Sequence, residues 1–506
     1  MSIGPEPVAV GERPIAPVRG TRDWLPGDFL RLAGLERLLL ERFARAGYAP
    51  MRTPVLEPTE LHERKSGAAI VSKLYELADG HPGAVCLRPE LTAGIVRAYT
   101  DAPEAPGLPW RVGHAGPVFR REKDPSPGRW REFHQAGVEL IGASGPAADG
   151  EVISLADWAL AEAGVQNARI RLGHVGLILE MLRRSGLPGP AQTALVETLG
   201  AASADGGDIS ALEVALDGLS DWLASADSAD EPPEVVQGDG AAVDRLFRTL
   251  VPVVNGRRDS REIVGRLRRK WDLGRSLRGV LDHVRDQVRA LAALKGPPAA
   301  VLDRLGRDFE ALAPESVAEL RALIATLDSY GIDPARIELD FGFGRGIGFY
   351  SQVIFAIVAT TPEGPLEICG GGRYDGLARV LGSDRDDHGV GFAIGLERLL
   401  QALPGATADP APSGYLVVRG RGGEREAARL TTTLRALGDR AVLDFGQPEA
   451  DSLARARALG LAKVVCWADG SAMPRALLIR DVVTGAEVEV SLRELEGPTR
   501  GEGRRR

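Results

Sequence analysis

Four side chains that could bind charged ligands lie in one stretch of the chain, residues 116–142 (GPVFRREKDPSPGRWREFHQAGVELIG). The pattern predicts an outgoing strand, a turn-rich loop and a return strand. Gln135 and Glu139 stand four residues apart on the return strand, so both point to the same face. Arg120 lies on the outgoing strand, and Arg129 lies where the loop closes. Two guanidiniums opposite an amide and a carboxylate could bind a phosphate beside an amine, although a charged surface hairpin is the alternative.

A second carboxylate stands at the predicted start of a helix. The segment LRPELTAGIVRAY (87–99) predicts a strand that ends at Leu87, followed by a helix that begins near Glu90 and Thr92. A carboxylate is favoured at that position by the helix dipole. Glu90 could therefore serve only to cap the helix, or it could receive the ammonium group of a substrate.

Composition narrows the class of protein. A chain of 506 residues, 44% hydrophobic and 26% charged, is typical of a soluble protein with two to four domains. The three cysteines are far apart and the seven histidines form no HExxH motif, so we expect neither a disulfide framework nor a metal site. The chain has no run of 18 apolar residues and no signal-peptide pattern at its start, which predicts a cytoplasmic protein with no membrane partner.

The elements that hold these residues follow from hydrophobic periodicity. Residues 1–19 are proline-rich and predict a mobile arm. A helix follows, with Asp28 as its expected cap. Pro50 and Pro54 in the next extended segment suit an edge strand, which is a natural place for self-association. The buried face of the helix is expected to hold Leu32, Leu35, Leu39 and Phe43.

Five segments in a fixed order resemble the catalytic core of class II histidyl-tRNA synthetases and their relatives. The resemblance covers roughly residues 20–185 and 335–402. It implies an α+β fold, with an antiparallel sheet flanked by helices and self-association through this core. The segments are GTRDWLP (20–26), LRPELTA (87–93), the hairpin at 116–142, GRGIGFYSQVIF (344–355), and CGGGRYDGL (369–377) followed by VGFAIGLERLL (390–400).

The resemblance also implies roles for individual side chains. In an active synthetase, which requires ATP and Mg²⁺, Arg120 and Arg345 would be the catalytic groups and would act on the ATP α-phosphate from opposite sides. Arg398 would lie against the adenine. Gly370, Gly371 and Gly372 would let backbone approach the ligand, or would only form a sheet corner. The expected pocket for histidine and its adenylate is formed by Glu90, Thr92, Arg120, Arg129, Gln135, Glu139, Arg345, Phe349, Tyr350 and Arg398.

One segment departs from the synthetase pattern. Synthetases of this family read Arg-Gly-Leu-Asp-Tyr-Tyr where this chain has Arg-Gly-Ile-Gly-Phe-Tyr at 345–350, so Gly348 and Phe349 remove a carboxylate and a hydroxyl. The strings FHQAGVELIG (133–142) and LGHVGLILEML (172–182) instead resemble regulatory subunits of ATP phosphoribosyltransferase. Those relatives do not aminoacylate tRNA; they partner a short catalytic subunit in the first step of histidine biosynthesis. For His174 of the second string we favour a structural role between a strand and a helix.

The middle of the chain is an insert, residues 186–334. From residue 186 to 244 it has no Lys or Arg and many acidic residues, and helical periodicity then continues to about residue 330. An acidic insert would repel RNA phosphates if it lay near a tRNA, whereas a solvated insertion without a role is the alternative.

The last part of the chain predicts a separate domain. Residues 403–413 form a Pro/Ala/Gly linker, and residues 414–496 alternate strands with helices. This alternation predicts a small α/β domain with a largely parallel sheet. The domain resembles the anticodon-binding domain of histidyl-tRNA synthetases, and residues 497–506 follow as a basic tail.

Three functional hypotheses follow. The favoured one is a non-catalytic regulatory subunit that binds histidine, needs no cofactor and forms a hetero-oligomer with a short-form ATP phosphoribosyltransferase catalytic subunit. The second is a histidine–tRNA ligase that uses ATP and Mg²⁺ to join histidine to its tRNA. The third is a synthetase-like enzyme or binder that recognises another small amino acid without tRNA.

Overall fold

The computed structural model describes two compact units, which divide between Leu403 and Pro404. We describe each unit by itself. The predicted bounds of the insert (186–334), the linker (403–413) and the terminal segments (1–19 and 497–506) remain predictions. The described residues are 15–77, 83–102, 107–187, 192, 195, 214, 216, 217, 273–343, 349–385, 387–403, 412–419, 423–445, 449–467 and 476–491.

In the described part of the first unit, the central element is a mixed sheet in the order β1-β5-β6-β12-β11-β10-β7-β9-β8. The end pairs β1/β5 and β7/β9 are parallel, and all other neighbours are antiparallel, so the sheet is mainly but not wholly antiparallel. Pro50 lies in β1 at the edge of the sheet, as predicted. The strands are β1 (Ala49–Met51), β5 (Trp110–Phe119), β6 (Glu132–Ile141), β7 (Arg169–His174), β8 (Lys295–Gly296), β9 (Ile337–Asp340), β10 (Val353–Thr361), β11 (Gly364–Arg373) and β12 (Gly389–Gly395).

The predicted hairpin is formed by β5 and β6. Gly116 pairs with Gln135 and Val112 pairs with Glu139, so the two ligand-type side chains of β6 share a face. The neighbouring strand approaches β6 very closely at Gly391, where an added Cβ would lie 1.9 Å from Glu139 Oε2. Only glycine leaves room for the carboxylate there.

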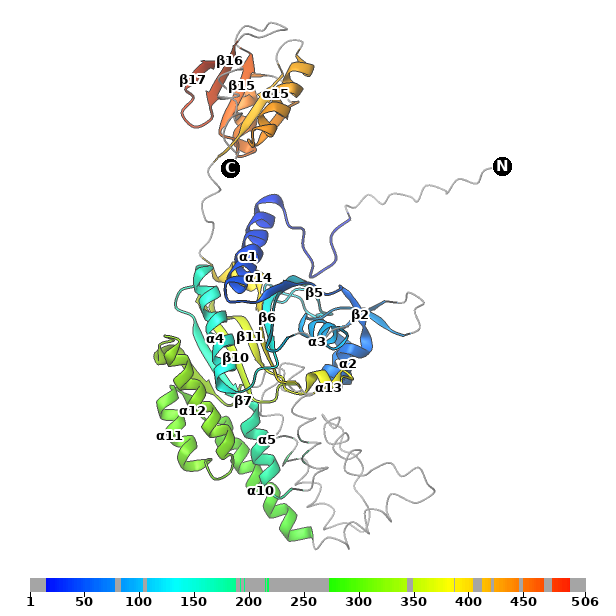
Figure 1. Cartoon of the computed structure of the whole chain (residues 1–506), viewed down its shortest axis with the longest axis vertical. Helices are drawn as coiled ribbons and strands as arrows, with labels where there is room; N and C mark the ends of the chain where they lie inside the picture. The colour runs from blue at the N-terminus through cyan, green and yellow to red at the C-terminus, as the bar shows by residue number, and fades with distance from the viewer. Residues whose placement is uncertain are drawn as a thin grey trace, which may run out of the picture. The chain divides into compact units, whose positions relative to one another are not determined.

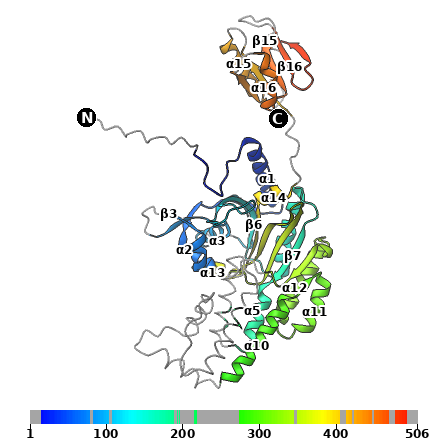
Figure 2. The ribbon, with the colours of Figure 1, turned by 180° about the vertical axis from the view of Figure 1, so that it is seen from behind.

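Helices cover the sheet, with α1, α4 and α14 packing on one face and the α2, α3 and α13 group lying on the other side (Figures 1 and 2). Helix α1 buries Leu32, Leu35, Leu39 and Phe43, as predicted. The prediction that Asp28 caps α1 is wrong, because Pro26 begins the helix and places Asp28 inside its first turn. These helices are α1 (Pro26–Arg45), α2 (Thr59–Ser66), α3 (Thr92–Thr100), α4 (Gly145–Glu162), α13 (Leu377–Val380) and α14 (Leu396–Ala402).

Further helices extend the same core. Helix α12 (Pro314–Ser329) packs on α4 and on α5 (Val175–Arg184), and α11 (Pro298–Asp308) packs on α12. Helices α11 and α12, together with α10 (Leu273–Ala292), belong to the predicted helical insert. None of the described helices is long and apolar enough to cross a membrane.

A small sheet beside α2 and α3 carries the segment before Glu90. Its order is β2-β4-β3, and both pairings are antiparallel. The strands are β2 (Leu56–Pro58), β3 (Tyr75–Leu77) and β4 (Val85–Leu87).

The second unit has a sheet in the order β14-β13-β15-β16-β17 in its described residues. The prediction of a largely parallel sheet is wrong for half of it: β13 pairs in parallel with β14 and β15, whereas β15/β16 and β16/β17 are antiparallel. Helices connect the parallel strands. A short turn joins β16 to β17, and two strands joined in this way run antiparallel. The elements are β13 (Tyr415–Val418), α15 (Glu424–Ala436), β14 (Ala441–Asp444), α16 (Ser452–Ala458), β15 (Lys463–Trp467), β16 (Leu477–Asp481) and β17 (Glu487–Val490).

Several predictions fall outside the described residues. They concern residues 1–14 of the predicted arm, most of the acidic stretch at 186–244, and the tail at 497–506. Arg345 and Gly348 are also outside them. Residues 15–19, the rest of the predicted arm, are exposed.

Candidate functional site

A cavity of about 410 Å³ lies where the hairpin, the start of α3 and strands β11 and β12 meet. It brings together residues from every described segment of the family resemblance except the first. Of the ten residues predicted to form a pocket, only Arg345 is outside the described residues. The other nine, all of which line the cavity, are Glu90, Thr92, Arg120, Arg129, Gln135, Glu139, Phe349, Tyr350 and Arg398.

Glu139 is the most deeply placed carboxylate of the cavity, with only 1% of its surface exposed. The hydroxyl of Tyr374 donates a hydrogen bond to its Oε2, and His114 Nε2 lies 3.7 Å from its Oε1. Burial, followed by the nearby Glu139 charge, raises the pKa of Tyr374 well above its usual value. Tyr374 is therefore a neutral donor that holds Glu139 in one orientation.

Arg373, the residue before Tyr374, holds the end of β11 in place through an ion-pair network. Its side chain is fully buried, and its guanidinium lies 2.7 Å from Asp149 Oδ1 of α4 and 3.0 Å from Asp375 Oδ1. It also donates to the Ala143 carbonyl at 3.0 Å. Since β11 ends at Arg373, this ion-pair network fixes where the chain leaves the sheet and where the Tyr374 ring enters the cavity.

Glu90 lies at the start of α3 and takes part in two kinds of contact. Its carboxylate accepts a hydrogen bond from the Ala93 N–H at 3.1 Å, so it caps the helix as the simpler interpretation predicts. Lys65 Nζ also lies 2.9 Å from Oε2, and His62 Nδ1 lies 3.6 Å from Oε1. Burial alone would raise the pKa of Glu90, but Lys65 and His62 outweigh it and hold the pKa well below its usual value.

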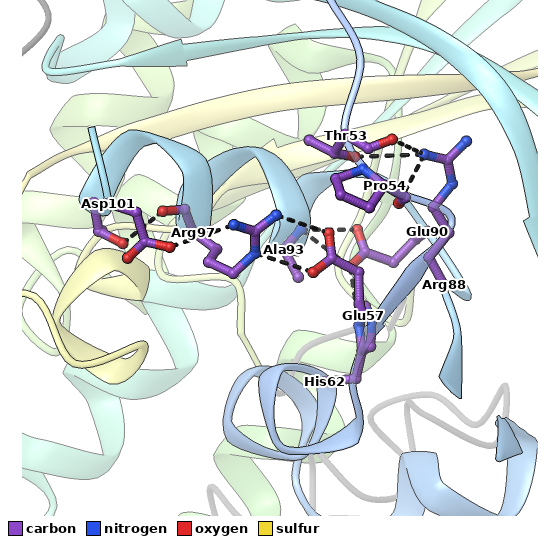
Figure 3. A network of polar contacts seen from close by, with 10 residues as sticks. Thr53, Pro54, Glu57, His62, Arg88, Glu90, Ala93, Arg97 and Asp101 are labelled. Carbon is purple, nitrogen blue, oxygen red and sulfur yellow. Dashed lines mark hydrogen bonds and ion pairs between the residues drawn. The ribbon is translucent and has the colours of Figure 1, made fainter. Parts of the chain in front are cut away.

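A buried arginine, Arg88, fixes the segment that carries Glu90. Its guanidinium donates to the carbonyls of Thr53 and Pro54 at 2.8 and 3.1 Å, and to the Pro117 carbonyl of β5 at 2.9 Å. Figure 3 shows Arg88 turned toward Thr53 and Pro54, while Glu90 faces the Ala93 end of α3. The cavity edge at Glu90 is thus tied to the hairpin through backbone groups.

Two arginines, Arg120 and Arg398, also line the cavity. Arg120 Nε donates to the Pro89 carbonyl at 3.0 Å, and Arg398 Nε donates to the Gly128 carbonyl at 2.9 Å. Burial lowers the pKa of both guanidiniums. Within the described residues neither forms an ion pair with a carboxylate, so both present positive charge to the cavity. A phosphate or carboxylate ligand would be favoured there.

The string LGHVGLILEML does not contribute to the cavity. His174 is buried at the end of β7, and its Nδ1 accepts the Leu177 N–H at 3.1 Å, which caps α5. Burial lowers its pKa to about 4, so the ring is neutral. This geometry supports the structural role that we favoured.

The glycines of the CGGGRYDGL segment serve the sheet more than the ligand. Gly370 lines the cavity, but a Cβ on Gly371 would lie 2.2 Å from the Gly391 carbonyl oxygen, and one on Gly372 would lie 2.6 Å from that of Val353. These two positions require glycine because neighbouring strands approach closely.

Several residues that line the cavity were not predicted from the sequence, among them Tyr374, His62, Lys65 and His114. Tyr374 stands inside a segment of the family resemblance, so its position could have identified it. His62, Lys65 and His114 gave no such signal, because His62 and Lys65 belong to a charged helix and His114 to an apolar strand. In the described part of the chain, both ring nitrogens of His114 and Nε2 of His62 lack hydrogen-bond partners, so a ligand could satisfy them. No group of three or more His, Cys, Asp or Glu residues suited to a metal occurs in the same part.

Comparison with known proteins identifies the family. The sequence model of the family "Histidyl-tRNA synthetase" matches residues 20–238 and 240–399. The histidine–tRNA ligase of Pyrococcus furiosus is 27% identical over 94% of this chain and 97% of its own length. The ATP phosphoribosyltransferase regulatory subunit of Moorella thermoacetica is 32% identical over 87% of this chain and 95% of its own length.

Solved structures show the same fold. The Bacillus halodurans protein described as an ATP phosphoribosyltransferase regulatory subunit/histidyl-tRNA synthetase aligns with a TM-score of 0.59 at 23% identity, covering 88% of this chain and 96% of its own. The histidyl-tRNA synthetase of Nostoc sp. PCC 7120 aligns with a TM-score of 0.61 at 17% identity, covering 96% and 99%. The fold is therefore that of a class II aminoacyl-tRNA synthetase core with a second C-terminal α/β domain, and the chain belongs to the histidyl-tRNA synthetase family.

Proposed function

We propose that this chain is a regulatory subunit of ATP phosphoribosyltransferase that binds histidine in the cavity and mediates feedback regulation of the first step of histidine biosynthesis. Its partner would be a short-form catalytic subunit in a cytoplasmic hetero-oligomer, with self-association through the class II core. The relative from Moorella thermoacetica, 32% identical and named as such a subunit, supports the proposal.

The observation that carries the proposal is Phe349. Its ring lines the cavity, lies 4.2 Å from the Tyr350 ring and packs under Lys65, with Nζ 4.1 Å from the ring centroid. An apolar ring thus stands where the synthetase pattern has a tyrosine hydroxyl, and the carboxylate before it in that pattern is replaced by Gly348. A pocket that loses two polar groups can keep its ligand but loses hydrogen bonds that orient a reacting group.

The deep part of the cavity keeps groups suited to histidine. Glu139 can accept an imidazole N–H, because Tyr374 occupies its Oε2 and leaves lone pairs on Oε1. Arg120 offers positive charge to a carboxylate. Histidine would regulate the partner by binding more tightly to one of two states of the complex, so the coupling equals the difference in binding free energy between the states.

A second candidate function is histidine–tRNA ligation. It is favoured by Arg120 and Arg398, which line the cavity without carboxylate partners among the described residues and suit the phosphates of ATP. The ligases of Pyrococcus furiosus and Archaeoglobus fulgidus also match 94% and 96% of this chain. In this function, Arg120 and Arg398 would hold the nucleotide, and ATP with Mg²⁺ would supply the phosphoryl chemistry that activates histidine.

Histidine-dependent ATP–pyrophosphate exchange tests the proposal against this alternative. We expect the purified full-length chain to bind histidine in calorimetry and to show no exchange above the value without histidine. A ligase would exchange pyrophosphate, because adenylate formation is reversible. Robust exchange would therefore overturn the regulatory proposal, and an authentic histidyl-tRNA synthetase in the same buffer provides the positive control.

A further inference from the structure

The contacts of Lys65 define an ammonium-binding site that the chain itself fills. Lys65 belongs to α2, and only 4% of its side chain is exposed. Its Nζ lies 2.9 Å from Glu90 Oε2 on one side and 4.1 Å from the centroid of the Phe349 ring on the other. A carboxylate opposite an aromatic face is the arrangement that proteins use to recognise ammonium ligands.

We propose that Lys65 is a built-in ammonium that competes with the α-ammonium of a ligand and so sets the specificity of the cavity. With Lys65 present, the cavity would bind histidine less strongly relative to an imidazole carboxylate without an α-ammonium, such as imidazole-4-propionate. Without Lys65, this relative preference would shift toward histidine. Histidine must displace Lys65 from Glu90 to bind fully. This inference rests on the proposed function, since it takes histidine as the ligand of the site.

Two other carboxylates of the cavity, Glu139 and Glu397, have partners of a different kind. Glu139 accepts from the neutral Tyr374 hydroxyl, and Glu397 accepts from the backbone N–H of His134 at 2.9 Å. Glu90 alone among these three holds a primary ammonium. Three other charged groups act on Glu90: His62 of α2, Arg88 of the preceding segment, and Arg120 at the end of the hairpin strand. None of them replaces Lys65. His62 Nδ1 is 3.6 Å away, and the two arginines donate to backbone carbonyls.

The position of Lys65 makes displacement feasible. Helix α2 ends at Ser66, and Gly67 follows with φ 75°, so the lysine lies in the last turn of a short helix. Its four-carbon stem can move the ammonium without moving the sheet that holds Glu139. Competition at Glu90 should therefore change the affinity for an ammonium-bearing ligand and leave the contacts of the imidazole end unchanged.

Calorimetry with a matched pair of ligands tests this assignment. L-histidine and imidazole-4-propionate differ by the α-ammonium, and each is titrated into the full-length wild type and into Lys65→Met. We expect the ratio of the imidazolepropionate Kd to the histidine Kd to rise at least tenfold in Lys65→Met, because Glu90 becomes free for the ligand ammonium. Lys65→Arg, which keeps the cation, should retain a ratio near that of the wild type.

Lys295→Met is the matched control. Lys295 Nζ also lies 2.9 Å from a carboxylate, Asp340 Oδ2, but this lysine does not line the cavity. The Lys295→Met variant should therefore leave the ratio of the two dissociation constants unchanged. A ratio that stays constant in Lys65→Met would overturn the assignment of Lys65 and leave the proposed function intact. Failure of both ligands to bind either protein would instead overturn both proposals.

A measurement on the wild type covers the case in which Lys65→Met does not fold. Reductive methylation with ¹³C-formaldehyde reports the accessibility of the Lys65 amine. Saturating histidine should increase its methylation at least severalfold, because the ligand ammonium expels it from Glu90, whereas imidazole-4-propionate should not. Equal reactivity with the two ligands would contradict the displacement.

Discussion

The Tyr374 hydroxyl donates a hydrogen bond to Glu139 and so joins the end of β11 to the return strand of the hairpin. The two residues are 235 positions apart in the chain and are both buried. Their contact fixes Glu139, the most deeply placed of the described carboxylates that line the cavity. The orientation of Glu139 therefore depends on the sheet and on Tyr374. It also depends indirectly on Arg373, whose ion pair with Asp149 holds the segment that carries Tyr374.

Replacing Glu139 with alanine should strongly weaken histidine binding. The variant removes the charged acceptor of the imidazole, and a hydrogen bond to a charged group contributes about 1.5–3 kcal/mol, which corresponds to roughly a tenfold to hundredfold loss of affinity. Calorimetric titration with histidine measures the effect. Tyr374→Phe, which keeps the carboxylate, should weaken binding less; unchanged affinity in Glu139→Ala would show that the pocket assignment is wrong.

Gly391→Ala should disturb the same site through packing alone. The new Cβ would lie 1.9 Å from Glu139 Oε2 and 2.5 Å from the Val138 carbonyl oxygen, so the carboxylate or a strand must move. We expect at least a tenfold loss of histidine affinity together with a lower thermal unfolding midpoint. Gly34→Ala in α1, where an added Cβ meets nothing within 4 Å, is the control and should lower neither. Normal affinity in Gly391→Ala would rule out the close approach of β12 to Glu139.

Arg373→Met should strongly destabilise the first unit. The substitution leaves the buried carboxylate of Asp149 without its partner at 2.7 Å, and breaking a buried ion pair costs about 3–5 kcal/mol. Scanning calorimetry of the full chain should show a lower midpoint for the transition of residues 1–403. Arg307→Met, which removes an exposed ion pair with Asp303, should change that midpoint little. Equal effects of the two substitutions would refute the importance of the buried network.

His174 should make stability depend on pH. Burial lowers its folded-state pKa from 6.5 to about 4, so between these values the unfolded chain binds more protons than the folded one. The free energy of unfolding should thus rise as pH increases from about 4 to 6.5, by up to about 3 kcal/mol from this residue, and stay level above that range.

His174→Asn isolates this effect. Asparagine can still accept the Leu177 N–H but does not titrate. The difference in unfolding free energy between wild type and variant, followed by urea denaturation across pH 4–7, should show the predicted slope. The same pH dependence in both proteins would mean that His174 is not held neutral by burial.

Much of the cavity follows from sequence pattern. The even spacing of Gln135 and Glu139 correctly placed both on one strand face, because the period of a strand is two. Glu90 was expected at a helix start, and it caps α3. The pairing of distant segments, such as β6 with β12, could be expected only from the family resemblance, because local periodicity does not determine which strands are neighbours.

The remainder depends on side-chain contacts that no local pattern carries. Lys65 belongs to the charged helix Thr59–Ser66 (TELHERKS), where an exposed lysine is the ordinary expectation. Its burial depends on Glu90 and Phe349, which are 25 and 284 residues further along the chain. The last two strands of the second unit were misjudged for a related reason, because alternation of strands and helices earlier in that unit does not fix the direction of a terminal hairpin.

The most direct test of the regulatory function is the rate of phosphoribosyl transfer by the short-form ATP phosphoribosyltransferase catalytic subunit of the same genome, assayed with this chain and increasing histidine. The account predicts that the chain activates the catalytic subunit and that histidine inhibits the complex. It also predicts that the complex with Glu139→Ala needs roughly tenfold to hundredfold more histidine for the same inhibition. A rate that is the same with and without this chain, at every histidine concentration, would contradict it.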